Sequence, residues 1–453
     1  MKDYQTVLEL CAVKDAAFAI DKNGMGTVFI IDHDEIVLGV VTDGDIRRYL
    51  ISGGLYEDCI RKCINTQFSY EHVSASRETI LKSLDDRVRY LPILNDLGKI
   101  VKIVSRKSYP IISDNLKCVR ARAPCRISFA GGGTDLSSHF LGDGTSLVLN
   151  VTVQKYCRAT MTVRSDQLVR LTSLDIGKTM EFQLSEVDNL RKTDFDLFIS
   201  IISIVRPVVG FDIQIESDVA IGTGLGGSSA ATAAFLGCLN EIRSIKWTSY
   251  ELAEICYQSE RHYADIPGGW QDQYACVFGG INLMTFSRDK HVVTPLKISD
   301  DVFDELEDSL ILYDTRKQRN SGKIHRANFG KNSKKKELAL IEAVELADAM
   351  KECILLGKLS ELGRLLDRAW LAKKKQDSNI SNPYLDDIYS GAKEHGAVGG
   401  KLLGAGAGGF FLFMAAPKNV PGLRSHLDSI GGRSERILLD KYGLKTWVVK
   451  NEI

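Results

Sequence analysis

The chain has 453 residues, of which 44% are hydrophobic and 26% are charged. This length is typical of two or three domains, and the composition predicts that each of them is globular. The 58 basic and 58 acidic residues cancel to a formal net charge of zero, which disfavours nucleic acid and anionic membranes as partners.

The 10 cysteines show no repeated spacing. The closest pair, Cys59 and Cys63, has no His or Cys cluster nearby to complete a zinc site, so we expect reduced thiols. The opening sequence MKDYQTVLEL lacks the pattern of a signal peptide, and the longest apolar run, 197–205, is about half of a bilayer span. The expected location is the cytoplasm.

Residues 26–53 and 90–109 share one pattern: a β-branched run, an Asp/Asn/Gly turn, a second apolar run and a polar helix start. This is a weak internal repeat. The first copy contains GVVTDGD, which resembles the signature of cystathionine-β-synthase (CBS) domains. The resemblance implies a regulatory CBS pair over residues 1–112, in which Thr42 and Asp45 hold the ribose of an adenosyl ligand such as AMP or ATP.

The second copy departs from that signature, because Ser105 stands in the place of Thr and Ser108 in the place of Asp. A ligand is therefore not expected there. An alternative for the first copy is that Asp45 only caps a helix, and that the pair is a spacer or dimerisation module. The pair favours a homodimer, and a linker is expected at 113–118.

From residue 119 onward, strands and helices are mixed. Period-two alternation predicts strands at 146–164 and 211–217, whereas 228–242, 248–264 and 337–372 carry apolar residues at helical spacing. The expected fold class is α+β, with an N-terminal lobe at about 119–300 and a C-terminal lobe at about 301–453.

The sequence GTGLGGSSAA at 222–231 matches the G-x-G-x-x-G fingerprint of dinucleotide-binding proteins. A Rossmann unit would place a second strand after the helix at 228–242, but 248–264 is another helix by its spacing. A Walker loop fails too, since the GKT at 177–179 has Thr172 where the first glycine is required.

What remains is a glycine loop that leads into the N-terminus of a helix. The free N–H groups and the positive end of the helix dipole favour an anionic phosphate there. Ser228 or Ser229 is placed to reach a phosphate or a phosphate-bound Mg²⁺. The alternative, in which Ser228 is only an N-cap, does not explain the glycines that precede it.

Charged residues accompany two further glycine-rich segments. Arg126 opens an apolar strand that runs into AGGGTDL, where Asp135 stands, and Asp272 follows a Pro-Gly-Gly loop with Glu260 twelve residues before it. A basic residue, two acids and a phosphate loop are the parts that phosphoryl transfer requires.

The motifs APCRISFAGGGTDL, GTGLGGSSAA and KLLGAGAGGFFLF, in this order, resemble those of the GHMP kinase family. The resemblance covers 119–453 and implies a two-lobed kinase that uses ATP and Mg²⁺. Within the family, RISFAGGGTD together with WQDQYA looks most like kinases of D-glycero-D-manno-heptose 7-phosphate and, more distantly, L-fucose kinases. Galactokinases carry Glu-His where Gly132 and Gly133 stand.

The resemblance implies a role for each matched residue. Asp272 is expected as the catalytic carboxylate with Arg126 as its partner, Ser228 and Glu260 as Mg²⁺ ligands, and Asp135 as a ligand of sugar hydroxyls. Arg126 and Glu260 have an alternative as ordinary ion-pair residues. The expected ATP-phosphate loop consists of Gly222, Gly224, Leu225, Gly226, Gly227, Ser228 and Ser229. The backbone is expected to lie close to the bound sugar at Gly132, Gly133, Gly404, Gly406 and Gly408.

The chain also departs from the family. Ala220 and Ile221 precede the second motif where the family often has Pro, and Gly227 replaces a Ser, so one hydroxyl is lost. The loop at 314–328 is rich in Arg and Lys, which would suit a phosphate on the acceptor sugar. The alternative is that this loop is simply exposed.

The expected function is ATP-dependent phosphorylation of the anomeric hydroxyl of D-glycero-D-manno-heptose 7-phosphate to the 1,7-bisphosphate. One alternative is a fucokinase-like 1-kinase of a free sugar. Another, outside enzymes, is a nucleotide sensor that binds adenosine nucleotides without turnover.

Overall fold

The computed structural model describes residues 5–75, 79–80, 83–84, 88–105, 118–140, 146–220, 222–288, 290–317, 334–377 and 379–449. The chain separates into two compact units, Met1–Asn115 and Leu116–Ile453. Of the expected linker at 113–118, only Cys118 is described, and it already belongs to a strand of the second unit.

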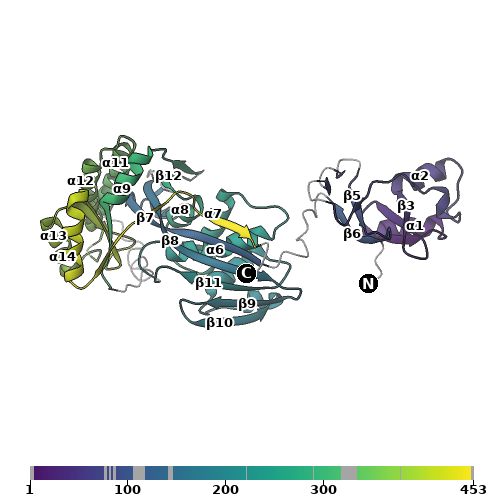
Figure 1. Ribbon diagram of the computed structural model, residues 1–453, viewed down its shortest axis with the longest axis horizontal. Coiled ribbons are helices and arrows are strands. Elements are labelled where there is room, and N and C mark those ends of the chain that lie inside the picture. Colours follow the sequence, from purple (N-terminus) through teal and green to yellow (C-terminus); the bar gives the residue numbers. More distant parts are fainter. Residues whose placement is uncertain are drawn as a thin grey trace. The chain divides into compact units, whose positions relative to one another are not determined.

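The first unit contains two three-stranded sheets of the same topology (Figure 1). In each sheet the first strand is parallel to the second, and the second is antiparallel to the third. The elements are β1 (Thr6–Leu8), α1 (Val13–Asn23), β2 (Thr27–Ile31), β3 (Val37–Thr42), α2 (Asp43–Ile51), a 3-10 turn (Ile60–Lys62), β4 (Glu71–His72), β5 (Tyr90–Leu94) and β6 (Ile100–Ser105).

The repeat extends to the pairing register. Thr42 lies opposite Thr27 at one end of the first hairpin, and Ser105 lies opposite Tyr90 at the same place in the second. An isolated antiparallel bridge between Ile36 and Lys99 joins the two hairpins. Ser108 lies outside the described residues, so the structure places only one of the two positions at which the second copy departs.

The second unit is built on a large sheet with the main order β10-β9-β11-β8-β12-β13, to which β7, β18 and β19 are added through β8 and β7. Its strands are β7 (Cys118–Ala130), β8 (Ser146–Val163), β9 (Leu168–Ser173), β10 (Lys178–Gln183), β11 (Phe211–Ser217), β12 (Ile281–Phe286), β13 (His291–Pro295), β18 (Leu439–Asp440) and β19 (Lys445–Val448). The predicted strands at 146–164 and 211–217 are confirmed as β8 and β11.

Helices pack on this sheet and form the core together with its strands. Helices α6 (Gly227–Glu241) and α8 (Gln271–Phe278) pack on β7 and β8, as does α11 (Lys334–Leu355) (Figure 1). The helices of this lobe are α4 (Ser137–Phe140), α5 (Asp196–Val205), α6 (Gly227–Glu241), α7 (Ser249–Gln258), α8 (Gln271–Phe278) and α9 (Asp300–Ser309), with a 3-10 turn at Leu184–Asn189 and a π-helical turn at Ser259–Tyr263. The predicted helix at 228–242 is α6, and that at 248–264 is α7 with the π-helical turn.

A second, antiparallel sheet has the order β15-β16-β14-β17 and carries the C-terminal lobe. Its core is centred on the fully buried Trp370, whose ring lies 5.7 Å from that of Phe411. The elements are β14 (Leu310–Asp314), α11 (Lys334–Leu355), α12 (Leu359–Gln376), α13 (Pro383–Glu394), β15 (Ala397–Leu402), β16 (Phe410–Ala415), a 3-10 turn (Pro417–Asn419), α14 (Val420–Ser429) and β17 (Arg433–Arg436).

The helical spacing at 337–372 is confirmed, but it belongs to two helices. Helices α11 and α12 are separated at Gly357, whose φ of 67° falls in the left-handed region that ends helices. The two lobes also do not divide the chain cleanly at residue 300. Strands β18 and β19, near the C-terminus, pair with β8 and β7 of the N-terminal lobe.

In the parts of the chain that the structure describes, no helix has the length and apolar character needed to span a bilayer.

Candidate active site

The second unit contains a cleft of about 1170 Å³. All three glycine motifs of the sequence contribute to its lining, and so do the Pro-Gly-Gly loop and the ends of α11 and α12. Among the predicted site residues, the cleft brings together Arg126, Gly132, Gly133, Asp135, Gly222, Gly224, Gly226, Gly227, Ser228, Asp272 and Gly404.

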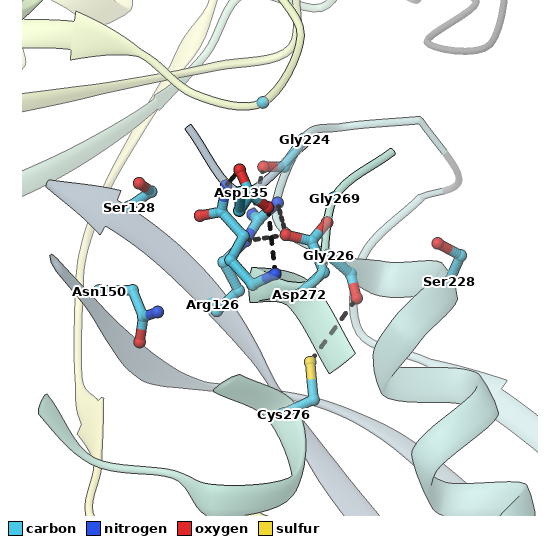
Figure 2. A network of polar contacts seen from close by, with 12 residues as sticks. Arg126, Ser128, Asp135, Asn150, Gly224, Gly226, Ser228, Gly269, Asp272 and Cys276 are labelled. Carbon is cyan, nitrogen blue, oxygen red and sulfur yellow. Dashed lines mark hydrogen bonds and ion pairs between the residues drawn. The ribbon is translucent and has the colours of Figure 1, made fainter. Parts of the chain in front are cut away.

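Arg126 and Asp272, which both line the cleft, form an ion pair (Figure 2). The period-two alternation of β7 places Arg126 on the face opposite the core residues Cys125 and Ile127. Its Nε and one terminal nitrogen lie 2.8 and 2.7 Å from one carboxylate oxygen of Asp272, in the first turn of α8. Burial opposes the positive charge of Arg126, but Asp272 outweighs it and the pKa of the guanidinium is raised.

The same guanidinium also holds the glycine loop. Its other terminal nitrogen donates to the carbonyl of Gly224 at 2.7 Å, while the backbone N–H of Arg126 donates to the carbonyl of Leu225 at 2.8 Å. The side chain of Arg126 is 6% exposed, against 23% for Asp272. The carboxylate is therefore the member of the pair that faces the cleft more openly.

The loop at 222–227 approaches the cleft through backbone. Gly222, Gly224 and Gly226 have φ values of 82°, 89° and 76°, a conformation that residues with a Cβ rarely adopt. Helix α6 begins at Gly227, so its first N–H groups and Ser228 face the cleft. Leu225 and Ser229 are completely buried and do not line it.

Glu260 lies beside Ser228, as the metal prediction requires, but it is completely buried and is not among the residues that line the cleft. The Ser228 hydroxyl donates to its carboxylate at 3.3 Å, and Arg261 donates to the same oxygen at 3.2 Å. Both Glu260 and Arg261 belong to the π-helical turn after α7, and such turns often occur at functional sites. Among the described residues, no group of three or more His, Cys, Asp or Glu side chains is placed to hold a metal ion.

Asp135 is held by the loop before α8, close enough to Arg126 and Asp272 for the three charges to interact. Its carboxylate accepts from the backbone N–H of Gly133 and from both the backbone and side-chain amides of Gln271, at 3.1 to 3.2 Å. It is only 2% exposed. Burial raises the pKa of Asp135, the negative charge of Asp272 adds to the rise, and the backbone hydrogen bonds oppose it.

The third glycine motif contributes less than expected. Gly404 lines the cleft, whereas Gly406 packs against Ile380 and Gly408 against the carbonyl of Lys317. The predicted specificity loop at 314–328 is described only as far as Lys317.

In the first unit, Thr42 and Asp45 form the reciprocal cap of α2. The Asp45 carboxylate accepts from the N–H and hydroxyl of Thr42 at 2.9 and 2.6 Å, and it is paired with Arg48. The capping alternative therefore describes a real contact of Asp45. This contact does not exclude a ligand, because the side chain of Asp45 is 21% exposed.

Sequence reasoning did not assign several side chains of the cleft, among them Arg261, Gln271, Lys336, Lys373 and Lys401. Arg261 ties Glu260 to the carbonyls of Ile266 and Gly269, and so joins the π-helical turn to the Pro-Gly-Gly loop. Lys401 interrupts the apolar pattern of β15, and a charged residue in such a run is a signal that could have identified it.

Comparison with family models gives three matches. The model of the GHMP kinases N terminal domain matches residues 195–280, the GHMP kinases C terminal model matches 347–422, and the CBS domain model matches 1–52. The CBS match covers the first sheet of the first unit and ends before the second.

Relatives match about three quarters of the chain. A D-glycero-alpha-D-manno-heptose 7-phosphate kinase from Campylobacter jejuni is 34% identical over 340 residues, 73% of this chain and 99% of that protein. The solved D-glycero-D-manno-heptose 1-phosphate kinase from Bacteroides thetaiotaomicron is 27% identical with a TM-score of 0.60, covering 73% of this chain and 99% of that one.

The L-fucokinase/L-fucose-1-P guanylyltransferase of Bacteroides fragilis is 28% identical over 70% of this chain and 37% of that protein. The ordered motifs, the two family models and the relative of 34% identity agree. The chain belongs to the GHMP kinase family and is a kinase that transfers a phosphoryl group to a hydroxyl of a sugar.

Proposed function

We propose that the protein is an ATP-dependent sugar kinase that phosphorylates the anomeric hydroxyl of D-glycero-D-manno-heptose 7-phosphate, giving the 1,7-bisphosphate. The observation that carries this proposal is the Campylobacter relative, which this chain matches over 99% of its length and which is named for that substrate. All three glycine motifs line one cleft, which supports the proposal.

Asp272 is the proposed general base. Its carboxylate accepts the proton of the acceptor hydroxyl as the bond between that oxygen and the γ-phosphorus forms and the bond to the β-phosphate oxygen breaks, releasing ADP. Arg126 keeps the carboxylate oriented through its two contacts of 2.7 and 2.8 Å. The glycine loop, which Arg126 also holds, binds the phosphates of ATP through its N–H groups.

Ser228 and Glu260 are the proposed holders of Mg²⁺. A hydroxyl and a carboxylate at 3.3 Å are oxygen ligands of the kind that Mg²⁺ takes, so the residues fit the ion. When bound, the ion would neutralise charge on the ATP phosphates. Arg261, which shares an oxygen of Glu260, limits how far that carboxylate turns.

Asp135 and Gln271 are the proposed acceptor-binding residues. Two lysines support an acceptor that carries a phosphate, because Lys336 from α11 and Lys373 from α12 both line the cleft. An ammonium group binds phosphate oxygens as a point charge.

A fucokinase-like 1-kinase of a free sugar is the second candidate, favoured by the Bacteroides fragilis relative at 28% identity. The non-catalytic sensor has lost its support, since the chain belongs to a kinase family and the cleft keeps Arg126, Ser228 and Asp272 together. For the first unit we propose that residues 1–112 form a CBS pair that dimerises the protein and binds an adenosyl ligand at Thr42 and Asp45.

A substrate panel tests the acceptor. ATP with heptose 7-phosphate, L-fucose, galactose or mevalonate is followed by coupled ADP release, and only the heptose phosphate is expected to give efficient turnover. Turnover restricted to an unphosphorylated sugar would contradict the proposal and favour the second candidate.

Asp272→Asn tests the base. The amide keeps the shape of the side chain but accepts no proton, so kcat should fall by about 10²- to 10⁴-fold, while the Kd of ATP changes less than about threefold. Steady-state kinetics and calorimetry measure the two effects, with the exposed Asp300→Asn as the matched control. A variant with more than half of the wild-type kcat would exclude Asp272 as the base.

Gly269→Ala tests the proposed role of Asp135 in binding the acceptor. A Cβ at this position would lie 2.0 Å from a carboxylate oxygen of Asp135, so the carboxylate must move. The KM for the sugar should rise by about 100-fold or more with the Kd of ATP unchanged, since the loss of oriented hydrogen bonds of this kind costs about 3 kcal/mol. Gly422→Ala, where a Cβ meets nothing within 4 Å, is the control and should leave KM unchanged.

Thr42→Val tests the adenosyl site. Calorimetry with AMP and with ATP should detect binding that Asp272→Asn retains and that Thr42→Val weakens about tenfold, because a ribose hydrogen bond is lost. The control is Asp43→Asn, an exposed acid in the same turn. The regulatory proposal fails if both nucleotides bind Thr42→Val as they bind the wild type, or if kinase rates do not respond to AMP.

A further inference from the structure

Lys401, one of the positively charged residues that line the cleft, has no role in the function described above. It lies in β15 of the C-terminal lobe, three residues before Gly404, and it lines the cleft although it is only 5% exposed. Lysine is rarely this deeply buried without an ionic partner, because the charged ammonium loses its hydration.

The contact that Lys401 makes crosses from the C-terminal lobe to the strand of Arg126. Its Nζ donates to the backbone carbonyl of Phe129 at 3.0 Å. The pairing of β7 with β8 shifts register between Ser128 and Ala130, so Phe129 falls at an irregularity of the ladder, where its carbonyl is available to a side chain. Lys401 therefore reaches the strand three residues from Arg126.

The ammonium group of Lys401 has donors left for a ligand, whereas Arg126 and Lys373 donate to several protein groups. In the described part of the chain no carboxylate oxygen lies within 4.0 Å of Nζ, and the Phe129 carbonyl takes one of the three protons of an ammonium group. Arg126, by contrast, is committed to Asp272 and to the Gly224 carbonyl. Lys373 donates to the carbonyls of Leu402 and Gly404.

The charge of Lys401 is poorly stabilised in the free enzyme. Burial lowers the pKa of its amine to about 7, and the nearby positive charge of Arg126 contributes to that fall. An anion that binds beside Lys401 would raise the pKa of its amine again. The anion gives the ammonium group an ionic partner and counteracts the positive charge of Arg126. The residue is therefore suited to an anion that is present only during the reaction.

We propose that Lys401 is a catalytic residue, whose ammonium group contacts the phosphoryl group as it passes from ATP to the acceptor hydroxyl. In that step the bond from phosphorus to ADP breaks, the bond to the acceptor oxygen forms and the hydroxyl proton goes to Asp272, while Lys401 keeps its own protons. Its contribution is electrostatic, because the positive charges of Lys401 and Arg126 together stabilise the negative charge on the oxygens of the transferred phosphoryl group.

A purely structural lysine would behave differently. If Lys401 served only to join the two lobes through Phe129, its removal would lower stability and any loss of activity would follow from that. If it is held charged for catalysis, its removal relieves an unfavourable buried charge, so that stability is retained or increased while turnover is lost.

The test compares Lys401→Met, which keeps the length of the side chain, with Lys401→Arg, which keeps the charge. The sugar accepted in the substrate panel serves as acceptor, so the test depends on the kinase activity and not on the heptose. For Lys401→Met we expect kcat to fall by about 10²- to 10³-fold, the Kd of ATP to change less than about threefold, and the Tm to equal or exceed that of the wild type. Lys401→Arg should recover at least about tenfold of the lost kcat.

Lys393→Met is the matched control, because Lys393 donates to the carbonyl of Val398 in the same strand and is not among the residues that line the cleft. It should leave kcat within about twofold of the wild type, since no charge near the transferred group changes. The proposal is overturned if Lys401→Met keeps kcat within threefold of the wild type, or if its Tm falls and Lys401→Arg restores no turnover.

A second measurement reports on the charge directly. Binding of ADP, Mg²⁺ and aluminium fluoride, together with the accepted sugar, is measured by calorimetry at pH 7.5 in buffers of different ionisation enthalpy. The wild type should take up a fraction of a proton that Lys401→Met does not, because the amine becomes fully charged beside the fluoride mimic of the phosphoryl group. Equal proton uptake by the two proteins would contradict the proposal.

Discussion

The arrangement of the cleft depends on the buried ion pair between Arg126 and Asp272. One guanidinium holds the carboxylate in the first turn of α8 and the carbonyl of Gly224 in the glycine loop (Figure 2). Two segments that are far apart in the sequence are thereby positioned from a single residue of β7. A buried charge that loses its partner destabilises a protein strongly, so either member of this pair requires the other.

The remaining contacts of the cleft are made largely by backbone. Carbonyls accept from Lys373, Lys401 and Arg261, while backbone N–H groups donate to Asp135. Backbone groups are fixed by the sheets and helices to which they belong, so they orient a charged side chain with little additional loss of conformational entropy. This explains why four glycine-bearing segments meet at one place, since side chains there would keep the backbone at a distance.

Much of this arrangement was predictable from local sequence. Periodicity predicts the strands β8 and β11 and the helix α6. The absence of a second strand after α6 excludes a Rossmann unit and leaves a glycine loop at the N-terminus of that helix. The break at Gly357 was not foreseen, because apolar spacing continues across it from α11 into α12. Leu225, Ser229, Gly406 and Gly408 match family motifs but do not line the cleft, and this depends on the path of the backbone, which the motifs alone do not reveal. The place of Lys401 in the cleft depends on its hydrogen bond to a carbonyl 272 residues away in the sequence, and local sequence patterns do not predict such a contact.

The pairing of β19 with β7 has a consequence for how the protein is made. The strand that carries Arg126 has Lys445–Val448 as its neighbour along Val119–Arg122, so one edge of the large sheet is completed by residues near the end of the chain. During synthesis β7 leaves the ribosome long before β19, and until β19 pairs with it the outer edge of β7 offers unpaired N–H and C=O groups to other chains. Protection of this edge therefore depends on a contact between segments that are made at very different times.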